Sequence, residues 1–187
     1  MPRLGTLGYA LLSVLAREEL AGYDIAQRMR RPVGFFWHAR HSQIYPELAK
    51  LEAAGMVTHR RIAQADRPDR KLYSITDKGL TALKRWVAEP PAEAPIRDEL
   101  VLKTYSLWVI DRAEAITLFR EQERRHAEVL ERFEAMERRM LAANGPALAQ
   151  GEGAQFALYA TLRRGLIFRR STLEWCRWVL ERLAAPA

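Results

Sequence analysis

A proline-rich segment near the middle of the chain, EPPAEAP at residues 89–95, separates two regions of different character. Proline inside a helix removes a backbone hydrogen bond and clashes with the preceding turn, so three prolines in seven residues cannot continue a helix. Helical and β patterns are mixed before this segment, whereas only helical patterns follow it. The sequence therefore predicts a domain at residues 1–88, a linker at 89–96 and a helical domain at 97–187.

Hydrophobic periodicity and turn residues predict six elements in the first domain. They are helices at residues 4–17, 23–30 and 42–55, strands at 56–62 and 71–75, and a helix at 78–89 that Thr76 and Asp77 cap. Ser42 is expected to cap the third helix, Pro46 to lie near its first turn and Gly55 to end it. The order helix, short helix, helix, hairpin, helix is that of a winged helix-turn-helix with a two-stranded wing.

The third predicted helix has one apolar side, because Ile44, Leu48 and Leu51 fall together at about 100° per residue. Small residues and polar arms occupy the rest of its surface: Ser42, Gln43, Tyr45, Pro46, Ala49, Lys50 and Ala53. Ser and Gln can hydrogen-bond to base edges, whereas Tyr and Lys can reach phosphates. The alternative is an alanine-rich helix that simply faces solvent.

The formal net charge of +7 and the pI near 9.9 favour an anionic partner such as nucleic acid. Residues 1–95 carry 15 Lys and Arg against 10 Asp and Glu, a net +5, and the remainder carries +2. The predicted hairpin concentrates this charge, with a net +3 between residues 60 and 71. Basic wing tips can hold the DNA backbone or enter the minor groove.

Three segments together resemble the PadR family of bacterial transcriptional regulators: LGYALLSVLAREELAGYDIAQRM, FFWHARHSQIYPELAKLEAAGMV and RPDRKLYSITDKGLTALKRWV. The resemblance covers residues 4–88. The second half is similar to longer-tailed members, whose C-terminal region resembles that of a virulence-activator family. The resemblance implies a homodimer that binds operator DNA, usually as a repressor, and is often released by a small molecule. We expect this regulator to act in the cytoplasm.

The resemblance also assigns DNA-binding residues. In the reading helix they are Ser42, Gln43, Tyr45, Pro46 and Lys50, and in the wing Arg61, Arg67, Arg70 and Lys71. Tyr23, in the GYD segment, corresponds to a backbone contact on the second helix. The aromatics Phe35, Phe36 and Trp37 are expected to pack the reading helix onto the first two helices.

The second half predicts helices at residues 97–109, 112–143 and 154–183, the second ended by Asn144, Gly145 and Pro146. Both long helices carry apolar residues at 3/4 spacing, with Glu123, Glu137 and Arg169 in register. An antiparallel hairpin would cover part of this surface, and a second copy of the chain could cover the rest. The residues expected at this dimer interface are Phe119, His126, Leu130, Phe133, Leu166, Leu173 and Leu180.

Three tryptophans in the helical half, Trp108, Trp175 and Trp178, could line a pocket for a flat apolar effector. Ordinary core and interface packing is the favoured alternative, since aromatics are common in both.

Catalytic and cofactor motifs are weak or absent in the sequence. GEGAQF, at residues 151–156, lacks the third glycine and preceding strand of a dinucleotide loop. His38, His41 and His59 have no neighbouring cysteine or paired carboxylate, so no metal or cofactor is expected. The single cysteine, Cys176, fits a reducing cytosol, and no run is long enough to span a membrane. Two rival functions remain: an enzyme, and a ligand-binding helical dimer whose winged domain binds protein.

Overall fold

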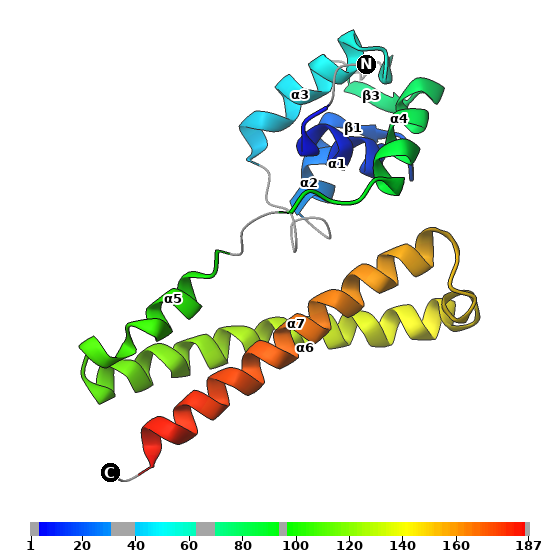
Figure 1. Ribbon diagram of the computed structural model, residues 1–187. Coiled ribbons are helices and arrows are strands. Elements are labelled where there is room, and N and C mark those ends of the chain that lie inside the picture. Colours follow the sequence, from blue (N-terminus) through cyan, green and yellow to red (C-terminus); the bar gives the residue numbers. More distant parts are fainter. Residues whose placement is uncertain (1–3, 31–39, 63–69, 94–96, 186–187) are drawn as a thin grey trace. The chain divides into compact units, whose positions relative to one another are not determined.

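The computed structural model describes residues 4–30, 40–62, 70–93 and 97–185. The chain forms two compact units, residues 1–93 and 94–187, which are described separately below (Figure 1). The aromatics Phe35, Phe36 and Trp37 lie outside the described residues, as does Arg67 in the wing.

In its described residues, the first unit combines four helices with a small antiparallel sheet. In chain order its elements are α1 (Thr6–Leu15), β1 (Leu20–Ala21), α2 (Gly22–Arg30), α3 (His41–Ala53), β2 (Val57–Ile62), β3 (Arg70–Ile75) and α4 (Asp77–Ala88). The sheet order is β1-β3-β2, so the predicted two-stranded wing gains a third, short strand. β1 forms where the sequence predicted only a break between helices, with Leu20 opposite Tyr73 and Ala21 opposite Leu72.

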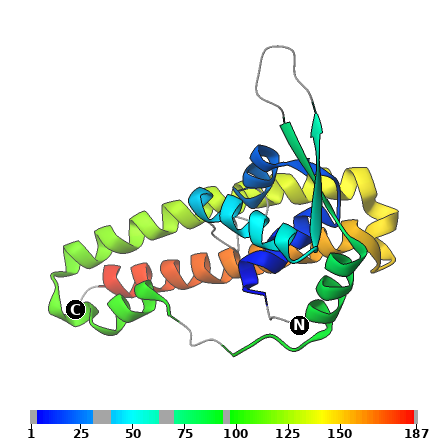
Figure 2. The ribbon, with the colours of Figure 1, turned by 90° about the horizontal axis from the view of Figure 1, so that it is seen from above.

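Strands β2 and β3 run side by side and extend away from the helices of their own unit (Figure 2). Their register sets Val57 opposite Ile75 at the base, where Val57 is buried in the core. Further out, Arg61 stands opposite Lys71, and both side chains are exposed. The hairpin is therefore anchored by apolar residues at its base and becomes basic along its length.

The apolar stripe of α3 is confirmed: Ile44, Leu48 and Leu51 are at most 1% exposed and belong to the core of the first unit. Gly55 adopts a φ of 67° just after the helix, as expected of a residue that ends it. The predicted cap is wrong by two residues, because the N-cap is Arg40 rather than Ser42. The Gln43 side-chain oxygen accepts a hydrogen bond from the Arg40 backbone N–H at 3.2 Å and so satisfies a donor at this earlier cap.

The second unit contains α5 (Glu99–Tyr105), the 3-10 turn η2 (Leu107–Val109), α6 (Arg112–Ala149) and α7 (Gly153–Ala184). The helix predicted at 97–109 is therefore two pieces, which part at Ser106 where the backbone leaves the helical region. The long helix does not stop at Gly145 and Pro146. It continues to Ala149 with Pro146 inside its last turns, and Leu148 is buried there, which offsets part of the cost of the proline.

Helices α6 and α7 form a long hairpin and lie against each other in both views (Figures 1 and 2). Two apolar clusters fill its interior. One contains Phe119, Cys176 and Val179, with Trp175 edge-on to Phe119 at 5.5 Å between ring centroids. The other contains Phe133, Leu162 and Leu166.

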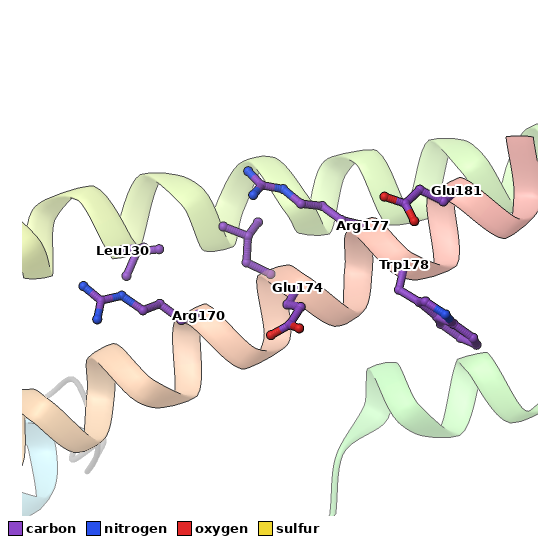
Figure 3. A pocket seen from close by; sticks show the side chains of 7 residues that line it. Leu130, Arg170, Glu174, Arg177, Trp178 and Glu181 are labelled. Carbon is purple, nitrogen blue, oxygen red and sulfur yellow. The ribbon is translucent and has the colours of Figure 1, made fainter.

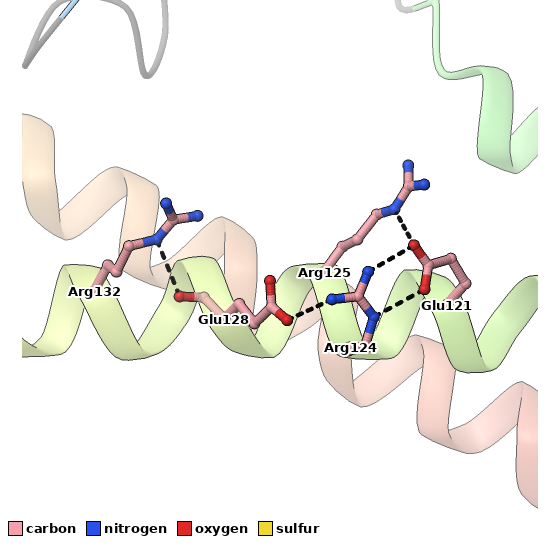
Figure 4. A network of polar contacts seen from close by, with 5 residues as sticks. All are labelled: Glu121, Arg124, Arg125, Glu128 and Arg132. Carbon is pink, nitrogen blue, oxygen red and sulfur yellow. Dashed lines mark hydrogen bonds and ion pairs between the residues drawn. The ribbon is translucent and has the colours of Figure 1, made fainter.

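The outer face of α6 is covered by a charged network (Figure 4). Glu121 pairs with Arg124 and Arg125, and Arg124 also pairs with Glu128. Hydrogen bonds from the two guanidinium groups lower the pKa of Glu121 to about 2. Exposed pairs of this kind add little stability, and the alternation of Glu and Arg is typical of a solvated helix face.

Candidate nucleic-acid interface

The outward side of α3 carries the residues that the sequence assigned to base reading. Ser42, Gln43, Pro46 and Lys50 are exposed, and Tyr45 is 44% exposed. Pro46 lies in the second turn rather than the first, and it cannot donate a hydrogen bond to the Ser42 carbonyl. The resulting surface is a ridge of short side chains with polar arms at its edges.

Tyr45 occupies the edge of α3 that faces α2. A Cβ atom on Gly22 would lie 2.7 Å from Cε1 of Tyr45, so the tyrosine ring covers the first residue of α2 at van der Waals distance. Tyr23 follows Gly22 directly, is 63% exposed, and accepts a hydrogen bond from Gln27 at 3.0 Å. Gly22 therefore permits the close approach of the Tyr45 ring to α2, and the exposed Tyr23 is the next residue along that helix.

A second edge of α3 is joined to the wing. The Glu52 carboxylate pairs with the His59 ring of β2, and that ring lies 5.7 Å from the Tyr73 ring of β3. Burial, followed by the negative charge of Glu52, raises the pKa of Tyr73. The reading helix and the wing are thus held together by side chains as well as by the loop between them.

The basic residues of the wing fall into two groups. Because opposed residues of an antiparallel pair point to the same face, Arg61 and Lys71 share one face, and Arg60 and Arg70 lie on the other. Arg60 pairs with Glu19 at 3.2 Å, and Arg70 pairs with Asp24 of α2. Within the described part of the chain, Arg61 and Lys71 have no ion-pair partner.

The carboxylates of Glu19, Asp24 and Glu52 are structural partners of the wing that the sequence analysis missed. Glu19 accepts hydrogen bonds from Ser74 and Arg60, which lower its pKa. Most of these contacts join residues more than 40 positions apart in the chain, so no local pattern marks them.

The predicted dimer residues divide by burial. Phe119, Phe133, Leu166 and Leu173 are at most 6% exposed, because α6 and α7 of one chain already cover them. A second chain would gain almost no burial from these four. His126, Leu130 and Leu180 are half-buried, and large exposed apolar side chains occur elsewhere: Leu102, Tyr105, Trp108, Ile167 and Trp178.

An open groove of about 500 Å³ lies along α6 and α7 (Figure 3). Leu130, Leu173 and Trp178 supply its apolar lining, and charged residues of α7 surround them. Of the three predicted effector-pocket tryptophans, Trp178 lines this groove. Trp175 packs against Phe119, and Trp108 is 83% exposed in η2.

A polar layer occurs in the hairpin between the two apolar clusters. Arg169 of α7 donates a hydrogen bond to Nδ1 of His126 on α6 at 3.2 Å, which requires a neutral imidazole. Burial, followed by the positive charge of Arg169, lowers the pKa of His126, while Asp98 acts in the opposite direction. A histidine at this seam is therefore held in its uncharged form.

This arrangement predicts that the second unit loses stability in acid. The unfolded chain protonates His126 near its ordinary pKa of 6.5, whereas the folded chain does so at lower pH. Between these values the unfolded state binds more protons, so the free energy of unfolding falls as the pH drops below 6.5. Thermal unfolding at about pH 7.5 and about pH 5.5 should show a larger fall in midpoint for the wild type than for His126→Gln. An equal fall in both proteins would contradict this role.

Among the described residues, no group of three His, Cys, Asp or Glu side chains is placed to hold a metal ion. None of the helices in that part of the chain combines the length and apolar character needed to cross a membrane. Cys176 is buried, and burial raises the pKa of its thiol.

A winged helix-turn-helix unit followed by a long helical hairpin defines the chain as a winged-helix transcriptional regulator. Residues 11–85 match the model of the transcriptional regulator PadR-like family, and residues 96–184 match that of the virulence activator alpha C-terminal region. The negative transcriptional regulator PadR of Bacillus subtilis is 34% identical over 176 residues, which cover 93% of this chain and 95% of that protein. The chain belongs to the PadR family.

Solved structures agree with this assignment. Bacillus subtilis PadR in complex with operator DNA has a TM-score of 0.82 and 31% identity, covering 96% of this chain and 99% of that one. The same protein in complex with p-coumaric acid has a TM-score of 0.73 and 29% identity, covering 97% and 100%. The Vibrio cholerae virulence activator AphA has a TM-score of 0.72 and 29% identity, covering 97% and 99%.

Proposed function

We propose that the chain is a homodimeric, sequence-specific DNA-binding repressor rather than an enzyme. The observation that carries the proposal is the opposed pair Arg61–Lys71 on an exposed face of the wing. Like charges directly opposed across two strands destabilise a sheet, and no carboxylate in the described residues compensates this pair. A phosphate backbone would supply the missing negative charge.

The reading helix supports the same function. Its outward ridge of small residues lets α3 lie deep in a major groove, where Ser42 and Gln43 reach base edges. In this proposal Tyr23, Tyr45 and Lys50 contact phosphates at the sides of the groove. In the same proposal, Arg61 and Lys71 contact the DNA backbone beside the groove. Arg70 instead stabilises the folded unit through its ion pair with Asp24.

The second unit is the proposed dimerisation domain. The exposed apolar side chains of α5, η2 and α7, together with the groove beside Trp178, form the surface that a second copy would cover. Two chains would then present two reading helices to half-sites about 34 Å apart or a multiple of that distance.

The direction of regulation and the effector are proposed by similarity. The Bacillus subtilis relative is a negative regulator and binds p-coumaric acid, so a repressor that acts in the cytoplasm and is released by a small aromatic compound is proposed here. The relative from Vibrio cholerae is an activator, which makes activation the alternative direction.

Fluorescence anisotropy of the full chain with the DNA upstream of its own gene tests the proposal. A scrambled duplex is the control, and both titrations are repeated from about 50 to about 200 mM salt. Tight binding to the upstream DNA, with weak and steeply salt-dependent binding to the control, is expected. Equal binding to both duplexes would reject sequence specificity, and salt-insensitive association with no DNA shift would favour the protein-binding alternative. Sedimentation of the same sample tests the dimer.

A further inference from the structure

The Gln43 side chain has two tasks in the proposed interface, and the first restricts the second. Gln43 is the third residue of α3, and its amide oxygen accepts the Arg40 backbone N–H at 3.2 Å. The Gln43 backbone N–H in turn donates to the Arg40 carbonyl at 2.9 Å. The side chain thus closes the N-terminal end of the reading helix.

The identity of the capped atom is fixed by chemistry. A backbone N–H is a donor, so its partner must be the amide oxygen and cannot be the amide nitrogen. Rotating the amide by 180° would set two donors against each other and leave the helix end open. The oxygen therefore has a lone pair engaged by the backbone, whereas both donors of the NH₂ group on this exposed side chain remain for DNA.

We propose that Gln43 reads DNA as a hydrogen-bond donor and selects guanine at the base that it contacts. This inference rests on the proposed function. A glutamine that reads adenine uses both amide atoms, accepting from N6 and donating to N7. The helix cap already engages the oxygen, which disfavours that arrangement. Guanine presents two adjacent acceptors, O6 and N7, in the major groove, and these match a group that can only donate.

Gln43→Glu separates the two tasks. Glutamate keeps an oxygen at the same distance from the backbone, and at the third helical position it caps well and favours the positive end of the helix dipole. It has no donor, so its outward oxygen would accept from N4 of cytosine. Gln43→Ala removes both the cap and the donor and is the matched comparison.

The experiment is selection of bound duplexes from a randomised DNA library by the full-length wild type and both variants. The wild type is expected to enrich guanine at one position in each half-site. Gln43→Glu should lose that guanine preference by about 5- to 150-fold and shift toward cytosine, with the other positions unchanged. Its thermal midpoint should equal or exceed that of the wild type, whereas Gln43→Ala should unfold at lower temperature.

The possible results separate the two proposals. Without enrichment of any sequence by the wild type, the DNA-reading function itself fails, and the inference fails with it. If the wild type enriches a sequence that Gln43→Glu also enriches unchanged, the function stands and the role of Gln43 is rejected. A wild-type preference for adenine at the position altered in Gln43→Glu would reject the donor-only reading, and a marked loss of stability in Gln43→Glu would reject the cap.

Discussion

Replacing Gly79 by alanine is expected to destabilise the first unit by about 3 kcal/mol or more, although alanine normally stabilises a helix relative to glycine. A Cβ atom on Gly79 would overlap the Met56 carbonyl oxygen and approach Cγ1 of Ile75 to 3.0 Å. The first turn of α4 therefore crosses the base of the wing with no room for a methyl group.

The surrounding backbone has little freedom to move away. The Met56 carbonyl accepts a hydrogen bond from the Thr76 N–H at 3.0 Å, and the Thr76 hydroxyl accepts the Gly79 N–H at 3.1 Å. Relief of the clash must break one of these bonds or shift α4 from the core. Because small domains are stable by only about 5–15 kcal/mol, a loss of this size is a large fraction of the total.

Hydrogen exchange of the full chain, followed by mass spectrometry, measures the effect in the first unit separately from the second. Amides of β2 and α4 should exchange faster in Gly79→Ala, while those of α6 and α7 should not change. Gly5→Ala is the matched control, because a Cβ at Gly5 meets nothing within 4 Å. Gly5→Ala should change the free energy of unfolding by less than about 1 kcal/mol. If the α4 amides of Gly79→Ala exchanged as slowly as in the wild type, the contact between Gly79 and the Met56 carbonyl would not be tight.

The features predicted correctly from the sequence are those that depend on neighbouring residues. The buried stripe Ile44, Leu48 and Leu51 follows from helical period alone, and Gly55 ends α3 for a local conformational reason. Strand β1 was missed because two residues carry no periodicity, and its pairing with β3 is a long-range event. The position of the α3 cap was missed because Gln43, rather than Ser42, supplies the oxygen.

In the helical second unit, periodicity predicts which side chains are buried but not which helix covers them. Periodicity identified Phe119, Phe133 and Leu166 as seam residues, and all three are buried. An apolar seam has the same pattern whether its partner is the next helix of the same chain or a helix of a second chain. The sequence could therefore predict that these side chains are covered but not which helix covers them.

In the candidate site, too, features set by neighbouring residues were predicted, whereas features set by contacts between distant residues were not. The exposed face of α3 was predicted from period, whereas the roles of the wing arginines depend on distant carboxylates. Arg61 and Arg70 look equivalent in the sequence. In the folded chain Arg70 is paired with Asp24, and Arg61 faces Lys71 instead.

The double variant Arg61→Ala, Lys71→Ala is expected to weaken DNA binding strongly while leaving the fold at least as stable as the wild type. Removing either charge relieves the repulsion across the strands, so stability should not fall. Each cation that contacts a phosphate contributes about 0.9 to the slope of log affinity against log salt. In a dimer that loses four such contacts, the slope should be reduced by up to about 3.6 and the affinity by on the order of 10³-fold at 0.1 M salt.

Anisotropy titrations over a salt series and thermal unfolding of the same samples provide the two readouts, and their opposite directions make the prediction specific. Arg120→Ala removes a positive charge from an exposed position on α6 and is the charge-matched control for a single contact. An equal loss of affinity per charge in this control would mean that net charge, not the wing, drives binding. Arg70→Ala should behave differently from the double variant, because it leaves the Asp24 carboxylate without its partner and should therefore reduce stability together with affinity. If the double variant lost stability as Arg70→Ala does, the opposed pair would be a structural element of the hairpin rather than its phosphate contact.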